Sequence, residues 1–164
     1  MIKLLIFDVD GTLTDGRITY DSNGIEQKSF NVKDGMAIAS WTKKFNMNAA
    51  IITGRTSSIV EKRSKELGIQ HLYQGIHNKD EIIQSIMKKL NITWSNVACI
   101  GDDLNDYKML KKAKISFCPA DAVDDIKNIC NIVCTKNGGA GTAREMIEYI
   151  LQYNDMDDLK SLWV

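Results

Sequence analysis

The sequence predicts an α/β fold of the Rossmann-like kind, a three-layer sandwich in which a mostly parallel sheet lies between two layers of helices. Two observations support this prediction: short apolar runs recur along the chain, and stretches with helical spacing separate most of them. Strands that alternate with helices form βαβ units, which build a parallel sheet covered on both faces. We expect one domain over residues 1–164, because this length suffices to bury a core.

The individual elements follow from local patterns. Runs rich in apolar residues and too short for a helix are expected to be strands. They are Lys3–Asp8, Ala49–Thr53, His71–Tyr73, Val97–Gly101, Ile115–Cys118 and Ile132–Cys134. Between them, residues three and four apart share one face and predict helices. These faces are formed by Ile59, Val60, Arg63 and Leu67, by Ile82, Ile83, Ile86, Met87 and Leu90, and by Met146, Ile147, Ile150 and Leu151.

Two segments lie outside this alternation. Residues 16–32 contain two alternating arms around the turn signal Asp21-Ser22-Asn23-Gly24, which predicts a β-hairpin over Arg17–Asn31. The tail, residues 153–164, is first acidic and then apolar, ending in Trp163 and Val164. We expect both segments to add to the α/β core rather than to form it.

Composition excludes several classes of function. Lys plus Arg and Asp plus Glu number 21 each, so nothing indicates nucleic acid or an anionic membrane surface as a partner. No apolar run approaches the ~20 residues of a membrane span, and the chain begins with a short strand-like run, so we expect no signal peptide. None of the four cysteines forms a C-x-x-C pair, which favours reduced core cysteines in a cytoplasmic protein.

Polar residues follow four of the expected strands. Because ligands of a parallel α/β sheet bind at the carboxyl ends of its strands, these residues should converge. They are Asp8 and Asp10; Thr53, Gly54 and Arg55; Gly75 and Lys79; and Asp102, Asp103 and Asp106. So many carboxylates would repel one another, and a divalent cation removes that conflict. Oxygen ligands without Cys or His indicate Mg²⁺.

The remaining groups at this edge suit a phosphate. Thr53 offers a hydroxyl, Gly54 a backbone amide, and Lys79 a positive charge near a helix N-terminus. One carboxylate of the Asp8/Asp10 pair could attack phosphorus, and the other could protonate the leaving oxygen and then deprotonate water. A solvated turn or a helix cap would explain any single motif, but their combination in this order favours phosphoryl transfer.

These motifs resemble those of the haloacid dehalogenase superfamily of phosphatases, over nearly the whole chain. The matching residues are Asp8-x-Asp10-Gly11-Thr12, Thr53, Lys79 and Gly101-Asp102-Asp103-x-x-Asp106. The resemblance implies that Asp8 is the nucleophile and Asp10 the general acid/base, while Thr53 and Lys79 hold the phosphoryl group. It also implies that Asp8, the Asp10 carbonyl and Asp102 hold Mg²⁺. Asp106 would orient Lys79 or a metal-bound water, and Asp103 would lie just outside this group.

The chain resembles a capless branch of that superfamily. Larger members carry a cap domain, but Asp10 to Thr53 holds only the hairpin and one helix, and Thr53 to Lys79 only one helix and a short strand. A site left open in this way suits either a macromolecular substrate or closure by a neighbouring subunit.

Four further segments resemble the 3-deoxy-D-manno-octulosonate 8-phosphate (KDO 8-phosphate) phosphatases. They are "VKDG" at Val32–Gly35, "ITGR" at Ile52–Arg55, "YQGIHNK" at Tyr73–Lys79 and "GGAGTARE" at Gly138–Glu145. This likeness implies a sugar-acid phosphate as substrate and a homotetramer in which hairpins and tails help close neighbouring sites. The chain departs from the family at Thr12, where a bulky apolar residue is common, and at Ala140, where a basic one is.

The sugar acid would need partners for its carboxylate, and Arg55, Lys33 and Arg144 are candidates. Three alternatives stay open. "GDDLNDYKML" also resembles phosphatases for acylneuraminate or deaminoneuraminate 9-phosphates, although Arg55 favours the octulosonate branch. An open site also allows a protein or nucleic-acid phosphate, and a similar domain ends some cytidylyltransferases, where it serves assembly.

Overall fold

A six-stranded sheet forms the centre of the computed structural model, which describes residues 1–164. The strand order is β5-β4-β1-β6-β7-β8, and all neighbouring strands are parallel. The strands are β1 (Leu4–Phe7), β4 (Asn48–Ile52), β5 (His71–Tyr73), β6 (Val97–Ile100), β7 (Ile115–Cys118) and β8 (Ile132–Val133). Every predicted strand is present, with ends that differ by at most one residue.

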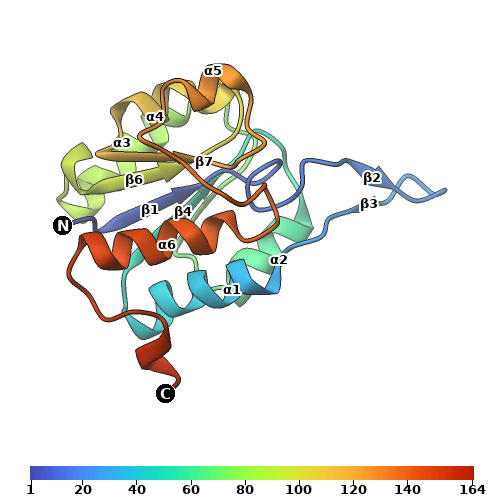
Figure 1. Cartoon of the computed structure of the whole chain (residues 1–164). Helices are drawn as coiled ribbons and strands as arrows, with labels where there is room; N and C mark the ends of the chain where they lie inside the picture. The colour runs from blue at the N-terminus through green and yellow to red at the C-terminus, as the bar shows by residue number, and fades with distance from the viewer.

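Helices cover both faces of the sheet, as predicted (Figure 1). One layer contains α1 (Val32–Ala39), α2 (Ser58–Glu66) and α6 (Thr142–Tyr153), and the other contains α3 (Lys79–Leu90), α4 (Tyr107–Lys112) and α5 (Asp124–Lys127). Shorter helical segments are the π-helical η1 (Ser40–Lys44) and the 3₁₀ turns η2 (Trp94–Asn96), η3 (Leu104–Asp106) and η4 (Lys160–Leu162).

The alternation of side chains along β1 divides the core between the two layers. Leu5 and Phe7 pack on the side of α1, α2 and α6, whereas Leu4 and Ile6 pack on the side of α3, α4 and α5. Successive strand side chains point to opposite faces, so a fully apolar β1 is what a strand buried on both sides requires. β1 is therefore held firmly at the centre, and its carboxyl end is a fixed point of the molecule.

The predicted hairpin is present and extends away from the body of the protein (Figure 1). Its strands, β2 (Thr19–Tyr20) and β3 (Glu26–Gln27), pair antiparallel over only two residues each. The Asp21 carboxylate accepts hydrogen bonds from the Asn23 and Ile25 amides, at 2.8 and 2.9 Å, and Gly24 takes a positive φ of 76°. The turn is thus built locally, while the arms expose Ile18, Tyr20 and Ile25.

The tail packs on the helices of its own chain. Leu159 is buried with residues of α1 and α6, and Trp163 lies against Lys44, whose Nζ is 4.5 Å from the ring centroid. Trp163 nevertheless keeps 59% of its surface exposed. The tail therefore lies along the α1/α6 layer rather than over the carboxyl ends of the strands (Figure 1). As predicted, no cap domain is present, because only the hairpin, α1 and η1 lie between β1 and β4, and only α2 and β5 between β4 and α3.

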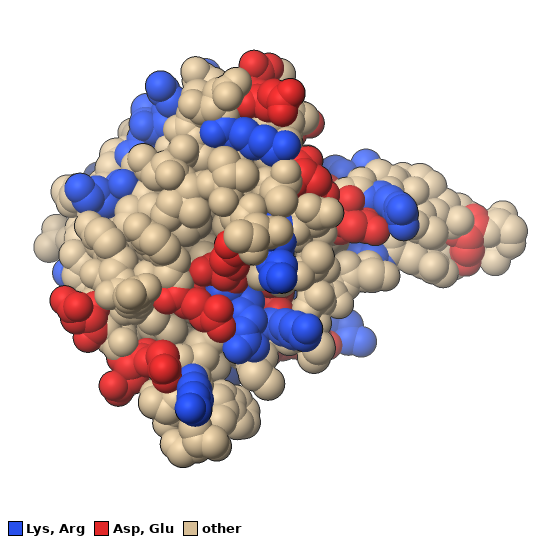
Figure 2. Space-filling model, viewed as in Figure 1, with Lys and Arg blue, Asp and Glu red and all other residues tan.

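The face that carries α6 and α1 is neither uniformly acidic nor uniformly basic. Acidic and basic side chains are interspersed there (Figure 2), as the balanced charge of the sequence implies. None of the helices combines the length and the apolar character needed to cross a membrane.

Candidate functional site

The sheet brings the predicted motifs together at its carboxyl edge. Asp8 follows β1, Thr53 follows β4, and Asp102 follows β6, three adjacent strands in parallel register. Lys79 begins α3, in the connection that leads from β5 toward β6. These residues lie 45 or more positions apart from Asp8 in the sequence, so their meeting confirms the reasoning from strand ends.

A buried ion pair network lies at the centre of the site. The Lys79 ammonium donates to Asp8 Oδ1 and to Asp106 Oδ1, both at 2.6 Å. Asp8, Lys79 and Asp106 expose only 3, 4 and 0% of their surfaces. A charged group so deeply buried is stable only when paired, which both carboxylates achieve through the one lysine.

Asp102 completes this group of carboxylates. One oxygen each of Asp8, Asp102 and Asp106 lies within 4.8 Å of the others. The Thr12 hydroxyl donates to Asp102 Oδ1 at 3.2 Å, and the Asp102 backbone N–H donates to Asp106 Oδ2 at 3.1 Å. Asp102 is thus held from both sides and is more exposed to solvent than its two neighbours.

Two glycines make room for these carboxylates. Gly11 has a φ of +94°, and a Cβ at this position would lie 2.1 Å from Asp102 Oδ2. A Cβ at Gly101 would lie 2.4 Å from Asp106 Cγ. The glycines of "DGT" and "GDD" are therefore required by the close approach of carboxylates, and at Gly11 also by the backbone conformation.

Burial and mutual repulsion shift the pKa values at this edge. Burial raises the pKa of Asp8 to about 8, Asp106 adds to the shift, and Lys79 opposes it. Burial also raises the pKa of Asp102 to about 7, with a further contribution from Asp106 and an opposing one from the Thr12 hydrogen bond. Burial alone would lower the pKa of Lys79, but Asp8 and Asp106 raise it above its usual value.

The arrangement of these carboxylates fits a cation. Lys79 pairs with Asp8 and Asp106 but not with Asp102, so the negative charge of the three close carboxylates is incompletely neutralised within the chain. The donor set is oxygen only, which suits a hard divalent ion such as Mg²⁺. Asp8 and Asp102 are placed to hold it, while Asp106 is already occupied by Lys79 and by the Asp102 amide.

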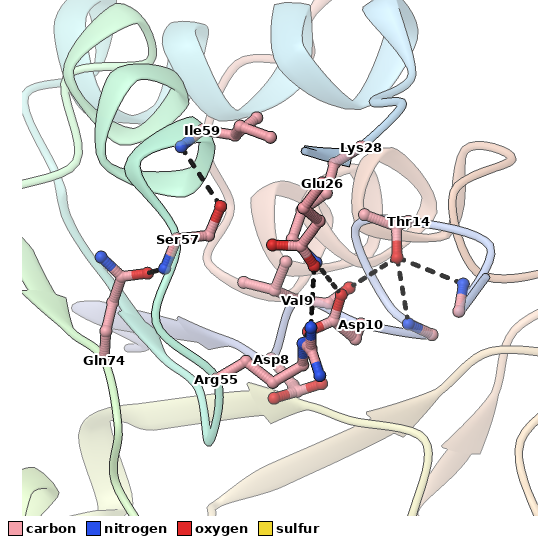
Figure 3. Close-up of polar contacts among 12 residues, drawn as sticks. Asp8, Val9, Asp10, Thr14, Glu26, Lys28, Arg55, Ser57, Ile59 and Gln74 are labelled. Atoms are coloured by element: carbon pink, nitrogen blue, oxygen red, sulfur yellow. Dashed lines mark hydrogen bonds and ion pairs between the residues drawn. The ribbon is translucent and has the colours of Figure 1, made fainter. Parts of the chain in front are cut away.

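The loop after β4 lies beside the carboxylates. Thr53 is buried at the strand end, and Gly54 and Arg55 are exposed in the turn that follows. The Ser57 amide donates to Gln74 Oε1 at 2.8 Å, and the Ser57 hydroxyl caps α2 by accepting from the Ile59 amide (Figure 3). Gln74 and Ser57, which the sequence motifs did not single out, thus fix the loop that presents Thr53 and Gly54.

A second charged cluster surrounds Asp10, and sequence reasoning found only part of it. Lys28, from the base of the hairpin, forms ion pairs with Asp10 Oδ1 and, at 3.2 Å, with Glu26 Oε1. Glu26 Oε1 also accepts from Arg55 Nη2 at 2.9 Å (Figure 3). Arg55 Nε is 4.0 Å from Asp10 Oδ2. Lys28 and Glu26 lie in an arm of the predicted hairpin, and no sequence motif pointed to them as site residues.

The other predicted residues lie apart from these clusters. Lys33 and Arg144 line a separate groove with Lys136 and Glu145, and Arg144 Nε pairs with Glu148 at 2.8 Å. Within one chain, the structure therefore does not bring Lys33 or Arg144 to the carboxylates.

Two aspartates near the motifs cap helical segments instead of meeting the carboxylate cluster. Asp103 is exposed and accepts from the Leu104 amide at the start of η3. The buried Asp34 of "VKDG" accepts from the Gly141 and Arg144 amides at the start of α6, at 3.3 and 2.9 Å.

The comparisons with known proteins agree with this geometry. Residues 71–146 match the family model of haloacid dehalogenase-like hydrolases. The chain is 43% identical over 150 residues to the 3-deoxy-D-manno-octulosonate 8-phosphate phosphatase of Salmonella typhi, covering 92% of this chain and 79% of the relative. It is 39% identical over 151 residues to the same phosphatase of Haemophilus influenzae, covering 92% of this chain and 83% of the relative.

Solved structures extend the likeness to the fold. The phosphatase of Moraxella catarrhalis, in complex with magnesium ion, phosphate ion and KDO, superposes with a TM-score of 0.89 at 42% identity, covering 92% of this chain and 86% of that one. The cobalt-bound form from Haemophilus influenzae gives 0.88 at 38% identity, covering 94% and 90%. The chain therefore belongs to the haloacid dehalogenase-like hydrolases, in the family of the KDO 8-phosphate phosphatases.

Proposed function

We propose that the protein is a Mg²⁺-dependent phosphatase that hydrolyses 3-deoxy-D-manno-octulosonate 8-phosphate to KDO and phosphate. The observation that carries the proposal is the buried network of Asp8, Lys79 and Asp106 beside Asp102, at the sheet edge where this fold binds ligands. Relatives of 43 and 42% identity, one of them solved with magnesium, phosphate and KDO, support the choice of ion and sugar.

The proposed chemistry uses the two aspartates of "DVD" in different roles. Asp8 attacks phosphorus through a carboxylate oxygen, and the bond between phosphorus and the sugar oxygen breaks as Asp10 gives that oxygen a proton. Water then attacks the aspartyl phosphate and gives a proton to Asp10, and the bond between phosphorus and Asp8 breaks. Asp8 and Asp102, with the backbone carbonyl of Asp10, would hold Mg²⁺, which supplies charge neutralisation for the phosphoryl group when bound.

Other residues bind and orient. Lys79 reaches Asp8 directly and is held by Asp106, so it is placed to bind the phosphoryl group beside the nucleophile. Thr53 and Gly54 offer a hydroxyl and an amide next to it. Arg55 lies at the mouth of the site, 4.0 Å from Asp10, and is our candidate for the sugar acid. We assign Lys33 and Arg144 no contact with substrate inside their own subunit.

The experiment that tests the proposal is a substrate panel. Steady-state kcat/KM is measured with Mg²⁺ on octulosonate 8-phosphate, on acylneuraminate and deaminoneuraminate 9-phosphates, and on simple sugar phosphates, with Asp8→Asn as the inactive control. We expect the octulosonate to be preferred. Higher turnover of a nine-carbon substrate would overturn the choice of sugar. Absence of any turnover would instead favour an assembly role like that of the cytidylyltransferase domains.

We also propose that the protein acts as a homotetramer in the cytoplasm. The hairpin exposes Ile18, Tyr20 and Ile25, and a two-stranded ribbon of this kind is marginal in water unless it packs on something. The four cysteines are unpaired, as expected in a reducing compartment. Sedimentation of the whole chain tests the assembly: a fully active monomer would contradict it.

The tail offers a separate test of closure between subunits. Leu159 is part of the core, so deletion of residues 160–164 removes Trp163 and Val164 while leaving that anchor. If these residues close a neighbouring site, KM for the sugar phosphate should rise while hydrolysis of a small aryl phosphate is unchanged. Equal effects on both substrates would show that the tail serves its own subunit only.

A further inference from the structure

The base of the hairpin places an ammonium group inside the catalytic site. The hairpin tip points away from the body (Figure 1), but Lys28 turns back from the β3 side toward the loop that follows β1 (Figure 3). Its side chain is only 1% exposed, while that of Asp10 is 19% exposed. The Lys28 ammonium is thus almost shielded from solvent at a position where the rest of the hairpin is largely exposed.

An ammonium that is removed from water must be compensated by nearby carboxylates. The partners of Lys28 are Asp10 Oδ1 and, at 3.2 Å, Glu26 Oε1. Glu26 is itself shared, because the same oxygen accepts from Arg55 Nη2 at 2.9 Å. Arg55 Nη2 also donates to the Tyr20 hydroxyl at 3.2 Å. Two hairpin residues therefore hold Arg55, and one hairpin lysine holds Asp10.

Asp10 has a demanding geometric task in the proposed reaction. It must reach the sugar oxygen in the first step and a water molecule in the second, and misplacement of a catalytic group by about 1 Å costs ~10²-fold. Nothing else restrains its carboxylate as closely: the other cation near it is Arg55, at 4.0 Å. The contact with Lys28 limits the side-chain rotamers open to Asp10.

We propose that Lys28 is a positioning residue for Asp10. Glu26 contacts both Lys28 and Arg55 and so fixes their positions relative to each other. The hairpin is then part of the catalytic machinery of its own subunit, whatever it contributes to assembly. This inference rests on the proposed function, because it assumes that Asp10 transfers protons.

The first test compares Lys28→Met with Lys28→Arg. Met keeps the length of the side chain but removes the charge, and kcat for the sugar phosphate should fall ~10- to 10²-fold, less than for loss of Asp10 itself. Arg keeps the charge and should restore part of the activity. Arg17→Met is the matched control, because Arg17 is a hairpin cation with an 85% exposed side chain that pairs only with Asp15. This control should behave like the unmodified protein.

The second test separates positioning from a general structural defect. An aryl phosphate releases a stable aryl oxide, so the first step needs no acid, whereas hydrolysis of the aspartyl phosphate still needs a base. In rapid mixing, Lys28→Met should give a burst of one aryl oxide per site followed by slow turnover. Loss of both phases in proportion, without a burst, would overturn the proposal and show that Lys28 only stabilises the fold.

The third test is the coupling between Lys28 and Asp10. If Lys28 acts through Asp10, Lys28→Met should add less than ~3-fold to the loss caused by Asp10→Asn. A double variant whose loss of kcat equals the product of the two single losses would overturn the proposal. An Asp10→Asn variant with unchanged turnover would instead overturn the proposed role of Asp10. If Lys28→Met does not fold, Lys28→Gln takes its place with the same expected burst and coupling.

Discussion

Two charged clusters meet at Asp8 and Asp10, and they are built on different foundations. Asp8 follows β1, Lys79 begins α3 and Asp106 ends η3, and all three are nearly inaccessible to solvent. Lys28, Glu26 and Arg55 join a two-residue ribbon to an exposed turn. In the first cluster the sheet sets the positions of the charged groups, and their close approach and burial raise the pKa values of these groups. In the second the ion pairs themselves hold the chain in place.

The difference matters for the proposed function, because each cluster holds one of the two aspartates to which we assign catalytic roles. The sheet cluster fixes the proposed nucleophile, which makes and breaks a covalent bond. The hairpin cluster holds the proposed proton carrier, which has to serve two different oxygens. We therefore expect changes in the sheet cluster (Asp8, Lys79 and Asp106) to affect stability or chemistry, and changes in the hairpin cluster (Lys28, Glu26 and Arg55) to affect mainly rate.

The largest expected effect is that of Asp8→Asn, which removes the proposed nucleophile. Uncatalysed hydrolysis of phosphate monoesters is so slow that enzymes reach accelerations of up to ~10²¹-fold. Turnover should accordingly fall to the limit of detection in a phosphate-release assay, while circular dichroism shows an intact fold. Activity near that of the unmodified protein would contradict the assignment of Asp8.

Asp106→Ala should have the next largest effect, and on stability. Asp106 is fully buried and shares Lys79 with Asp8, so its removal leaves the buried ammonium with one partner. Breaking a buried pair typically costs ~3–5 kcal/mol, offset here in part by relief of the repulsion between Asp106 and Asp8. Urea unfolding without metal should show a loss of more than about 1 kcal/mol. A smaller loss would mean that Lys79 is solvated in the variant.

The pH dependence of Mg²⁺ affinity tests the sheet cluster without a substitution. The pKa values of Asp8 and Asp102 are raised to about 8 and about 7, so both carboxyls are partly protonated near neutral pH without metal. A cation binds only the deprotonated carboxylates, so Mg²⁺ binding must release protons. The affinity for Mg²⁺ must therefore rise between pH 6 and 8, by up to ~10-fold per pH unit for each proton that the ion displaces. Calorimetry in two buffers of different ionisation enthalpy measures that release. Affinity independent of pH would contradict it.

Glu26→Gln should have the smallest effect, confined to the hairpin cluster. Gln keeps the size of the side chain but removes the charge that Lys28 and Arg55 share. Glu26 is only partly buried, and exposed ion pairs contribute ~0–1 kcal/mol, so the thermal midpoint should barely move. We expect kcat/KM to fall several-fold and to lose part of its salt dependence. A large loss of stability would show that the hairpin is a structural element like the sheet.

Much of the site follows from the sequence because a parallel sheet turns order along the chain into position in space. Each apolar run ends at the same edge, and Asp8, Thr53 and Asp102 meet there because β4, β1 and β6 are neighbours in the sheet. Gly11 and Gly101, which make room for the carboxylates, are also part of the sequence motifs "DGT" and "GDD". For the same reason, the alternation of strands and helices sufficed to predict the three-layer fold.

What the sequence by itself determined is therefore the sheet, its edge and the residues that follow its strands, because these depend on local periodicity and on one rule of topology. Only the tertiary structure decided that Lys28 reaches Asp10, that Asp34 caps a helix 107 residues away, and that Arg144 faces Glu148 rather than the carboxylates. Those contacts join segments with no shared periodicity. Their geometry depends on how the hairpin, α1 and α6 pack, which no single stretch of sequence encodes.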